Sequence, residues 1–349
     1  YEALRTGEID ITDWPMTKDW IDKFARTPEE VTLRDYSEFG EFGFAINNQR
    51  WPTGIGDRPD DTLTYDPETG TYKHWFDPTN EWDLRAWMFR LAIVYLTDRA
   101  YIITDILKGY GYRMDTYMPA PAAGYLDYKN LTESSFVTPY GVITVPSLIF
   151  SYNSTMAAQI LDAAGFADTD DNGVRNDPRK AGYPGAGSDL DPLIFYIRLD
   201  DPNRKAAGEK LAKDMKELGI PVDARVVEKT VAFKSVMIEY NYHIYTEGYS
   251  LGADPDFLYG LLHSSQYWAP IGWSGGYQGF CHREHDEWVL AVKNPLTYED
   301  MIHAVRKATF LESKYVASIP LWCSAGVQGY RTGWTGVVNH EGYGPSAPI

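Results

Sequence analysis

The second half of this 349-residue chain alternates short apolar runs with amphipathic segments, and this alternation constrains the fold more than any other feature. It predicts strands at residues 193–198, 221–228 and 242–249, with helices at 203–217 and 229–239 between them. Each helical crossover is long enough to return the chain in the same direction, so we expect the three strands to lie parallel in one sheet. The pattern therefore predicts an α/β fold with helices packed on the sheet.

Further helices and strands are expected around this α/β block. Residues 31–48 alternate apolar and polar side chains and predict one or two strands, and a hairpin is expected to turn at Pro67–Gly70. The stretch 83–166 has the periodicity of three helices, with a proline-rich crossing before the third. A long helix at 297–315 is expected to lead into a strand at 319–323.

Composition excludes several classes of function. A net charge of −17 argues against a nucleic-acid partner and against docking on an anionic lipid surface. The sequence contains no apolar run long enough to span a membrane, and no metalloprotease, P-loop, dinucleotide-binding or serine-hydrolase motif. Aromatic residues make up 15% of the chain, which suits both a core and a ligand cleft. Nothing in these patterns indicates catalysis.

Several segments, taken in order, resemble one known family. They are GEIDI at 7–11, FGFAINNQRWP at 42–52, the helical run 83–166, EGYSLGADPDFLYGLLHSS at 247–265, SGGYQGFCHREHDEWV at 274–289 and SIPLWCSAGVQGYRTGW at 318–334. Their order and spacing resemble the extracellular solute-binding proteins of peptide and nickel ABC transporters, the family 5 binding proteins.

The resemblance implies a periplasmic-binding-protein-like fold of type II, in which two lobes close on a ligand. Residues 36–319 are expected to form the C-terminal α/β lobe, with a mostly parallel sheet. Residues 1–35 and 320–349 are expected to belong to the N-terminal lobe, into which the chain passes at both ends. The rest of that lobe is missing here, so the second lobe is incomplete. Because the sequence also starts at Tyr1 inside a helical pattern, we interpret it as a fragment or a processed chain.

One position departs from the family in its chemistry. Peptide-binding members place an Asp four residues before the proline at 255, where its carboxylate pairs with the peptide amino group, and this chain has Leu251 there. An apolar residue at the anchor position favours a peptide held by its backbone or an uncharged ligand such as an oligosaccharide. The nearby Asp254 is interpreted as a helix cap, with ligand contact as the alternative.

Aromatic and amide side chains are the remaining candidates for ligand contact. Tyr249, Trp273 and Tyr277 stand near loop-forming glycines and prolines, and loops at the carboxyl ends of parallel strands are where open α/β sheets bind ligands. Asn47 and Asn48 end a strand that the resemblance places at the hinge. The alternatives are aromatic rings that pack the loops themselves and a plain turn at the two asparagines.

The sequence DTDDNGVRND at 168–177 has the form of a calcium-binding loop. No cofactor is expected to be required. Asp168, Asp170 and Asn172 occupy the first, third and fifth positions around a glycine turn, as oxygen ligands of calcium do. The acidic residue expected at position twelve is absent, so Asp177 at position ten would have to replace it. A solvated turn without metal is the alternative interpretation.

Cysteines and histidines suggest two further features. The resemblance places Cys281 and Cys323 at the edge of the lobe near the hinge, and an exported protein meets an oxidising environment, so the two are expected to be close and to form a disulfide. Two separate buried thiols are the alternative. His282 and His285 are interpreted as part of a polar helix start, since a metal site needs a third ligand.

The resemblance implies the substrate-binding component of an ABC importer, located outside the cell membrane or in the periplasm and anchored to the membrane when intact. Its partners would be an oligopeptide or an oligosaccharide, the missing N-terminal segment and a membrane permease, and no residue would be catalytic. One alternative is a glycoside hydrolase with two carboxylates, which would need a suitable separation and one raised pKa. Another is a structural cell-surface protein built on a binding-protein scaffold.

Overall fold

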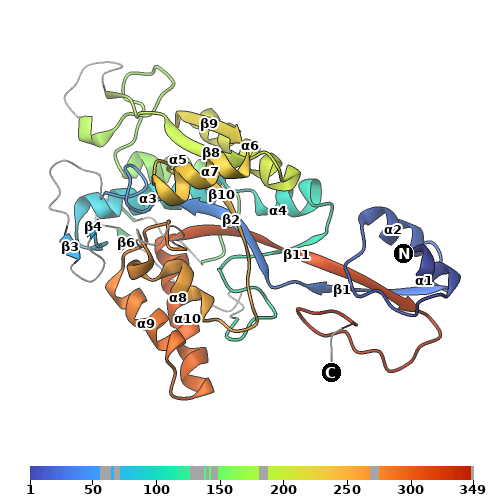
Figure 1. Cartoon of the computed structure of the whole chain (residues 1–349). Helices are drawn as coiled ribbons and strands as arrows, with labels where there is room; N and C mark the ends of the chain where they lie inside the picture. Colours follow the sequence, from blue (N-terminus) through green and yellow to red (C-terminus); the bar gives the residue numbers. More distant parts are fainter. Residues whose placement is uncertain are drawn as a thin grey trace.

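A computed structural model describes most of the chain, and its centre is one mixed seven-stranded sheet in the order β1–β11–β2–β10–β8–β9, with β5 on the edge of β11 (Figure 1). The described residues are 1–55, 64–66, 71–125, 137–138, 141–142, 148–180, 188–267 and 275–346. Trp273 and the predicted turn at Pro67–Gly70 lie outside them.

The three predicted parallel strands are confirmed. β8 (Leu193–Arg198) pairs in parallel with both β9 (Val222–Val227) and β10 (Ile244–Ser250). The crossovers are α6 (Pro202–Glu217), and α7 (Lys229–Phe233) with the π-helical turn that follows it. Asp201 begins α6, because its side chain accepts hydrogen bonds from two backbone N–H groups in the first turn, and Pro202 stands at the helix start, where its missing N–H has no cost.

The other strand pairs are antiparallel, so the sheet as a whole is mixed rather than mostly parallel. β2 (Gly40–Ile46) runs antiparallel between β10 and β11 (Ser318–Arg331). β1 (Val31–Ser37) and β5 (Gly111–Arg113) also pair antiparallel with β11. β2 and β11 approach one another from distant parts of the chain and not through a short helical crossover, which is why the local pattern did not predict their direction.

Two groups of helices cover the sheet. One group packs around α3 (Glu81–Leu96), of which 13 of 16 residues are buried, and it includes α5 (Ser154–Ala163) and α6. A helix that is apolar on all sides belongs in a core, which explains its central position. The other group contains α8 (Phe257–Leu262), α9 (Arg283–Lys293) and α10 (Tyr298–Tyr315), with its own apolar cluster.

A short helical element follows α3. Asp98 begins α4 (Arg99–Tyr101) by accepting a hydrogen bond from the backbone of Tyr101, and a π-helical turn at Ile102–Ile106 continues it to Gly109. The expected hairpin is present as β3 (Thr64–Asp66) paired with β4 (Thr71–Lys73). A second two-stranded pair, β6 (Val137–Thr138) with β7 (Gly141–Val142), was not expected. Among the described residues, no helix is both long and apolar enough to cross a membrane.

The first 37 residues and the end of β11 form a smaller unit at one side of the main body (Figure 1). It contains α1 (Glu2–Thr6) and α2 (Lys18–Phe24), which bury their apolar faces against β1 and β11. Two connections join this unit to the main body among the described residues: the link between β1 and β2, and the strand β11. The site described next lies at this junction.

Candidate ligand-binding cleft

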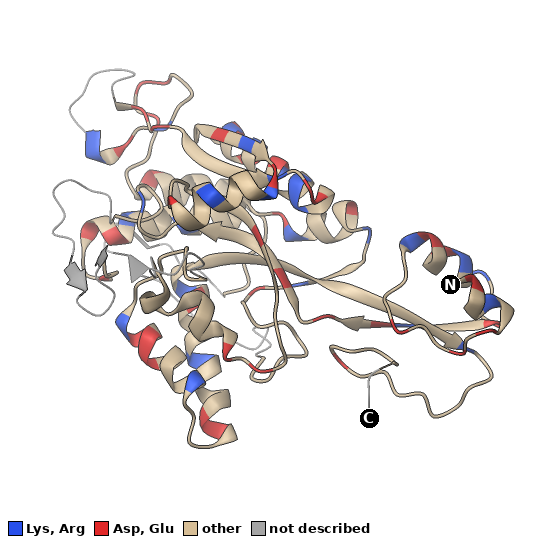
Figure 2. Ribbon diagram, viewed as in Figure 1, with Lys and Arg blue, Asp and Glu red and all other residues tan. Residues whose placement is uncertain are grey.

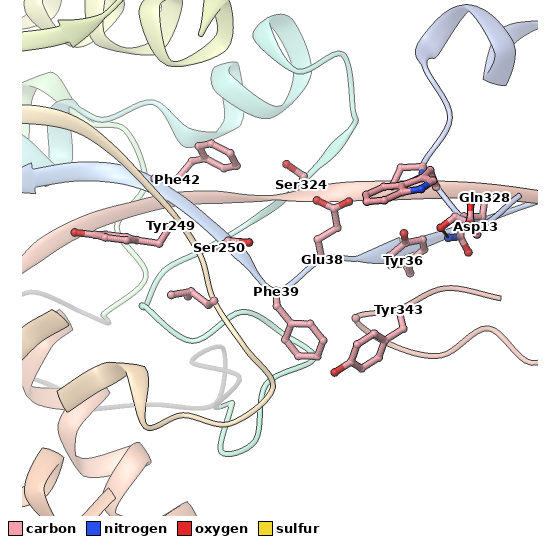
Figure 3. A pocket seen from close by; sticks show the side chains of 16 residues that line it. Asp13, Tyr36, Glu38, Phe39, Phe42, Tyr249, Ser250, Ser324, Gln328 and Tyr343 are labelled. Atoms are coloured by element: carbon pink, nitrogen blue, oxygen red, sulfur yellow. Dashed lines mark hydrogen bonds between the residues drawn. The ribbon is translucent and has the colours of Figure 1, made fainter. Parts of the chain in front are cut away.

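A cleft of about 560 Å³ lies where the smaller unit meets the main body (Figure 3). Its lining comes from residues 13–15, from both sides of the β1–β2 link, from the end of β10 at 248–251, from β11 and from the C-terminal loop. The carboxyl end of β10 therefore forms part of the cleft wall, as expected for an open sheet with parallel strands. Segments from both ends of the chain complete it.

Aromatic side chains dominate the lining. Trp14, Tyr36, Phe39 and Phe42 line one part of the cleft, and Tyr343 packs edge-on against Phe39 with ring centroids 5.1 Å apart. Trp14 is 74% exposed although it is one of the largest apolar side chains. Exposed flat rings around a hollow provide stacking area for sugar rings and for peptide side chains.

The charged side chains that line the cleft are both acidic. They are Asp13, from the smaller unit, and Glu38, from the β1–β2 link. Among the described lining residues there is no Lys and no Arg. Partial burial raises the pKa of Glu38 above its ordinary value, because burial disfavours the charged form.

Of the six predicted contact residues that the structure describes, two line the cleft and four do not. Tyr249 and Leu251 contribute to its wall at the end of β10. Tyr277 is buried inside the protein, where its hydroxyl donates a hydrogen bond to Glu247. Asp254 is exposed in the turn before α8 and accepts a hydrogen bond from the backbone N–H of Asp256, so it stabilises that turn.

Asn47 and Asn48 also lie away from the cleft, in contrast to the expectation. The cleft is at the start of β2, whereas these residues follow its other end. The Asn47 amide donates to the carbonyl oxygens of Tyr240 and Tyr242, at 3.2 and 3.1 Å. The Asn48 amide donates to three carbonyl oxygens and holds loops together beneath the sheet. Both residues thus hold the chain in place and are occupied in doing so.

A pair of glutamates that the sequence did not single out lies next to the cleft wall. Glu41 is paired with Tyr249 across β2 and β10, and Glu247 is opposite Gly43, so the two carboxyl groups share one face of the sheet. Both are completely buried. Glu247 accepts hydrogen bonds from the Tyr117 hydroxyl, from Ser318 Oγ at 2.6 Å, from the Tyr277 hydroxyl at 2.9 Å and from Gln278 Nε2 at 2.8 Å.

The two glutamates differ in the groups that surround their carboxyl groups. Burial raises the pKa of Glu41 well above its ordinary value of 4.5, and the charge of Glu247 raises it further. Neither oxygen of Glu41 has a hydrogen-bond partner within the described residues. Burial raises the pKa of Glu247 as well, but its four donors stabilise the ionised form. Within this pair, the hydrogen bonds to Glu247 therefore offset part of the effect of burial, whereas no described hydrogen bond does so for Glu41.

The loop proposed for calcium brings only part of its predicted ligand set together. Asp168 accepts hydrogen bonds from the backbone of Asn172 and Gly173, as in a turn. Asn172 directs its amide nitrogen, which cannot bind a metal, toward Asp170. Asp177 is buried elsewhere, with its carboxylate on the indole nitrogen of Trp51. Within the described ranges, no three His, Cys, Asp or Glu side chains group as a metal site requires.

The expected Cys281–Cys323 disulfide is wrong. No disulfide joins the two cysteines, and both are buried. Cys323 lies on β11 with its Sγ 3.0 Å from the hydroxyl of Ser37 on β1, whereas Cys281 precedes α9 and its carbonyl oxygen accepts from the backbone of Phe76. The resemblance placed both near the hinge, but only Cys323 is at the junction with β1.

The histidines near α9 form a helix start and a buried ion pair. The ring of His282 accepts a hydrogen bond from the backbone N–H of His285, as a helix cap does. His285 is fully buried with Nε2 3.0 Å from Glu312. Burial lowers the pKa of His285, but the carboxylates of Asp286 and Glu312 outweigh this effect and raise the pKa to about 9.

Residues that line the cleft but were not predicted come mainly from the two ends of the chain and from the β1–β2 link. Asp13, Trp14 and Tyr343 approach the cleft because β1 pairs along its whole length with residues 325–331 of β11. The segment Glu38–Gly40 carried the one local signal, since an acid, an aromatic residue and a glycine interrupt two alternating runs.

The cleft with aromatic walls thus lies where the smaller unit meets the main body. The chain belongs to the bacterial extracellular solute-binding proteins of family 5, whose model for the middle region matches residues 1–269. No curated protein sequence matches the chain.

Solved structures share this fold at low sequence identity. AppA of Bacillus subtilis, in complex with a nonapeptide, is 17% identical with a TM-score of 0.61, over 97% of this chain and 55% of AppA. HbpA2 of Haemophilus parasuis is 17% identical with a TM-score of 0.67, over 99% and 54%. A periplasmic oligopeptide-binding protein of Thermotoga maritima with mannohexaose bound is 16% identical with a TM-score of 0.62, over 95% and 53%. The chain thus spans about half the length of these proteins.

Proposed function

We propose that this chain belongs to the substrate-binding component of an ABC importer, which captures an oligopeptide or an oligosaccharide and delivers it to a membrane permease. The aromatic cleft at the junction of the two units is the observation that carries the proposal. In this account residues 36–319 belong to the C-terminal lobe, and residues 1–35 and 320–349 belong to the N-terminal lobe, whose remaining segment would complete the enclosure of the ligand. Lobe closure would then bury the ligand against the rings.

The nature of the lining supports both ligand classes. Rings such as Phe39 and Phe42 offer apolar faces, and the end of β10 at 248–251 offers backbone groups for directional hydrogen bonds. Among proteins of similar fold, one holds a nonapeptide and another holds mannohexaose. We therefore keep both classes in the proposal.

Binding is favoured over hydrolysis by the placement of the carboxyl groups. A glycosidase needs two carboxyl groups that reach one glycosidic bond. Glu41 and Glu247 interact with one another, but both are completely buried and lie out of reach of a sugar.

The proposed location is outside the cell membrane or in the periplasm, with the intact protein anchored to the membrane. The matched family is extracellular by its description. Figure 2 shows Lys and Arg interspersed with Asp and Glu along helices such as α6 and α10. The net charge of −17 argues against a nucleic-acid partner.

Mass spectrometry under native conditions tests the proposal directly. The intact protein that carries this chain would be purified from its own host without denaturation. We expect an added mass that corresponds to an oligopeptide or an oligosaccharide and that is released on unfolding. Incubation with peptides and oligosaccharides that yields cleavage products would favour the hydrolase, and a protein that neither carries nor binds such molecules would contradict the proposal.

A further inference from the structure

The cleft has an unbalanced charge. Its lining contains the carboxyl groups of Asp13 and Glu38, and among the described lining residues no basic side chain accompanies them. Arg204 is a cation close to one lining residue, since its guanidinium lies 5.9 Å from the ring centroid of Phe42. Arg204 is buried and donates a hydrogen bond to the backbone oxygen of Thr246, so it does not line the cleft. The free volume therefore faces two negative charges.

Glu38 is fixed in position, but its carboxylate has no hydrogen-bond or ion-pair partner among the described residues. It stands on the link between β1 and β2, and its backbone N–H donates to the carbonyl oxygen of Ser324 on β11 at 3.0 Å. Within the described residues, no hydrogen bond or ion pair engages its side chain. Figure 3 shows Glu38 between Tyr36 and Phe39 along the chain, at the edge of the hollow. A half-buried carboxylate in this state is stabilised by any cation that reaches it.

Several properties of the surroundings fit a cation. Burial, and after it the charge of Glu38, raises the pKa of Tyr36 to about 12. Tyr36, Phe39 and Phe42 line the same hollow, and aromatic faces attract positive groups. Position 251, where the resemblance implies an acid in peptide-binding members, is the apolar Leu251. The cleft nevertheless contains carboxyl groups, because Asp13 and Glu38 also line it.

We propose that Glu38 is the specificity-determining anchor of this cleft and that it selects a ligand with a protonated amine. The inference rests on the proposed function and deepens it. A lysine side chain or free amino end of a peptide and an amino sugar share this chemistry, so the test includes both. Glu38 binds the ammonium group by a charge-assisted hydrogen bond, while the neighbouring rings cover the carbon skeleton.

Calorimetric titration of the intact protein with matched probes tests the anchor. The peptide probes are three pentapeptides of alanine with Lys, Gln or Glu at the centre, each acetylated at one end and amidated at the other. A fourth, with Gln at the centre and a free amino end, tests the terminal ammonium group. The sugar probes are chitotetraose and its fully deacetylated form. The variant is Glu38→Gln, and the control is Glu29→Gln, which removes the same charge from an exposed position outside the cleft.

We expect a cationic probe to bind about tenfold more tightly than its neutral counterpart, since close charge pairs at partly desolvated sites are typically worth at least that factor. The preference should vanish in Glu38→Gln and persist in Glu29→Gln, and both variants should melt as the parent does. Binding without any charge preference, or a preference that survives Glu38→Gln, would overturn the inference alone. Failure of every probe to bind would contradict the proposed function as well.

Discussion

Gly43 lies opposite Glu247 in the β2–β10 ladder, and the space beside Gly43 holds the carboxyl group of Glu41. A Cβ atom on Gly43 would lie 2.3 Å from Oε1 of Glu41 and 2.9 Å from the backbone oxygen of Ile319. Because Gly43 has no side chain, the carboxyl group of Glu41 fits into the space opposite Glu247 on the same face of the sheet.

Gly43→Ala is expected to lower the free energy of unfolding by about 2 kcal/mol, because overpacking a close-packed core costs about 1–3 kcal/mol. The matched control is Gly333→Ala, where a Cβ atom would meet nothing within 4 Å. Its expected change is below about 0.5 kcal/mol, as for other surface substitutions. Urea unfolding of both variants measures the difference, and equal stabilities would contradict the packing described here.

Glu41→Gln is expected to stabilise the protein relative to the parent as pH rises. The folded-state pKa of Glu41 lies above its ordinary value of 4.5, so its contribution to stability is fully present below pH 4.5 and is lost as pH rises through the raised pKa. Glutamine keeps the neutral form throughout. Unfolding free energies at pH 4 and pH 7 should therefore diverge in favour of the variant, and a difference that stays constant with pH would show that the pKa of Glu41 is not raised.

Glu312→Gln is expected to lower the free energy of unfolding by about 3 kcal/mol at neutral pH, because it leaves the buried imidazolium of His285 without its closest counter-charge. In the parent, the pKa of His285 is about 9, above its ordinary value of 6.5. The contribution of this ion pair is therefore fully present below pH 6.5 and is lost as pH rises through 9.

The control for Glu312→Gln is Glu217→Gln, which breaks an exposed pair with Lys213 whose closest atoms are 3.6 Å apart. Exposed pairs contribute less than about 1 kcal/mol. Thermal unfolding at several pH values compares the two. Similar losses in both variants, or a loss from Glu312→Gln that does not shrink above pH 9, would contradict the ion pair.

Calcium at millimolar concentration is expected to leave the melting temperature unchanged. The contacts of Asp168 and Asn172 are those of a solvated turn, and Asp177 is occupied by Trp51. A ligand that binds only the folded state would raise the melting temperature. A rise that disappears in Asp168→Asn would restore the calcium site proposed from the sequence.

Local patterns predicted the local parts of this fold. The parallel strands β8, β9 and β10 followed from helical crossovers of suitable length, because such crossovers join strands that are neighbours along the chain. The antiparallel partners of β11 could not be predicted, since Val31 pairs with Arg331 from the other end of the chain. Periodicity carries no information about such pairings.

The site was predicted only where one strand end forms it. Tyr249 and Leu251 follow directly from the end of β10, whereas Asp13, Glu38 and Tyr343 join them only through the long pairing of β1 with β11. Asn47 and Tyr277 were assigned to the ligand, but their side chains are occupied by backbone groups and by Glu247. A sequence shows that a polar residue is present, but only the fold shows what already satisfies it.

Calorimetry on Phe39→Ala tests the central claim most directly, with a nonapeptide and mannohexaose as probes for the intact protein. Phe39 lines the cleft, whereas Tyr298, at the start of α10, is 63% exposed and lies away from it. We expect at least one probe to bind, Phe39→Ala to weaken that binding by about tenfold through lost stacking, and Tyr298→Ala to leave it unchanged. Undiminished binding by Phe39→Ala would contradict the assignment of this cleft as the ligand site.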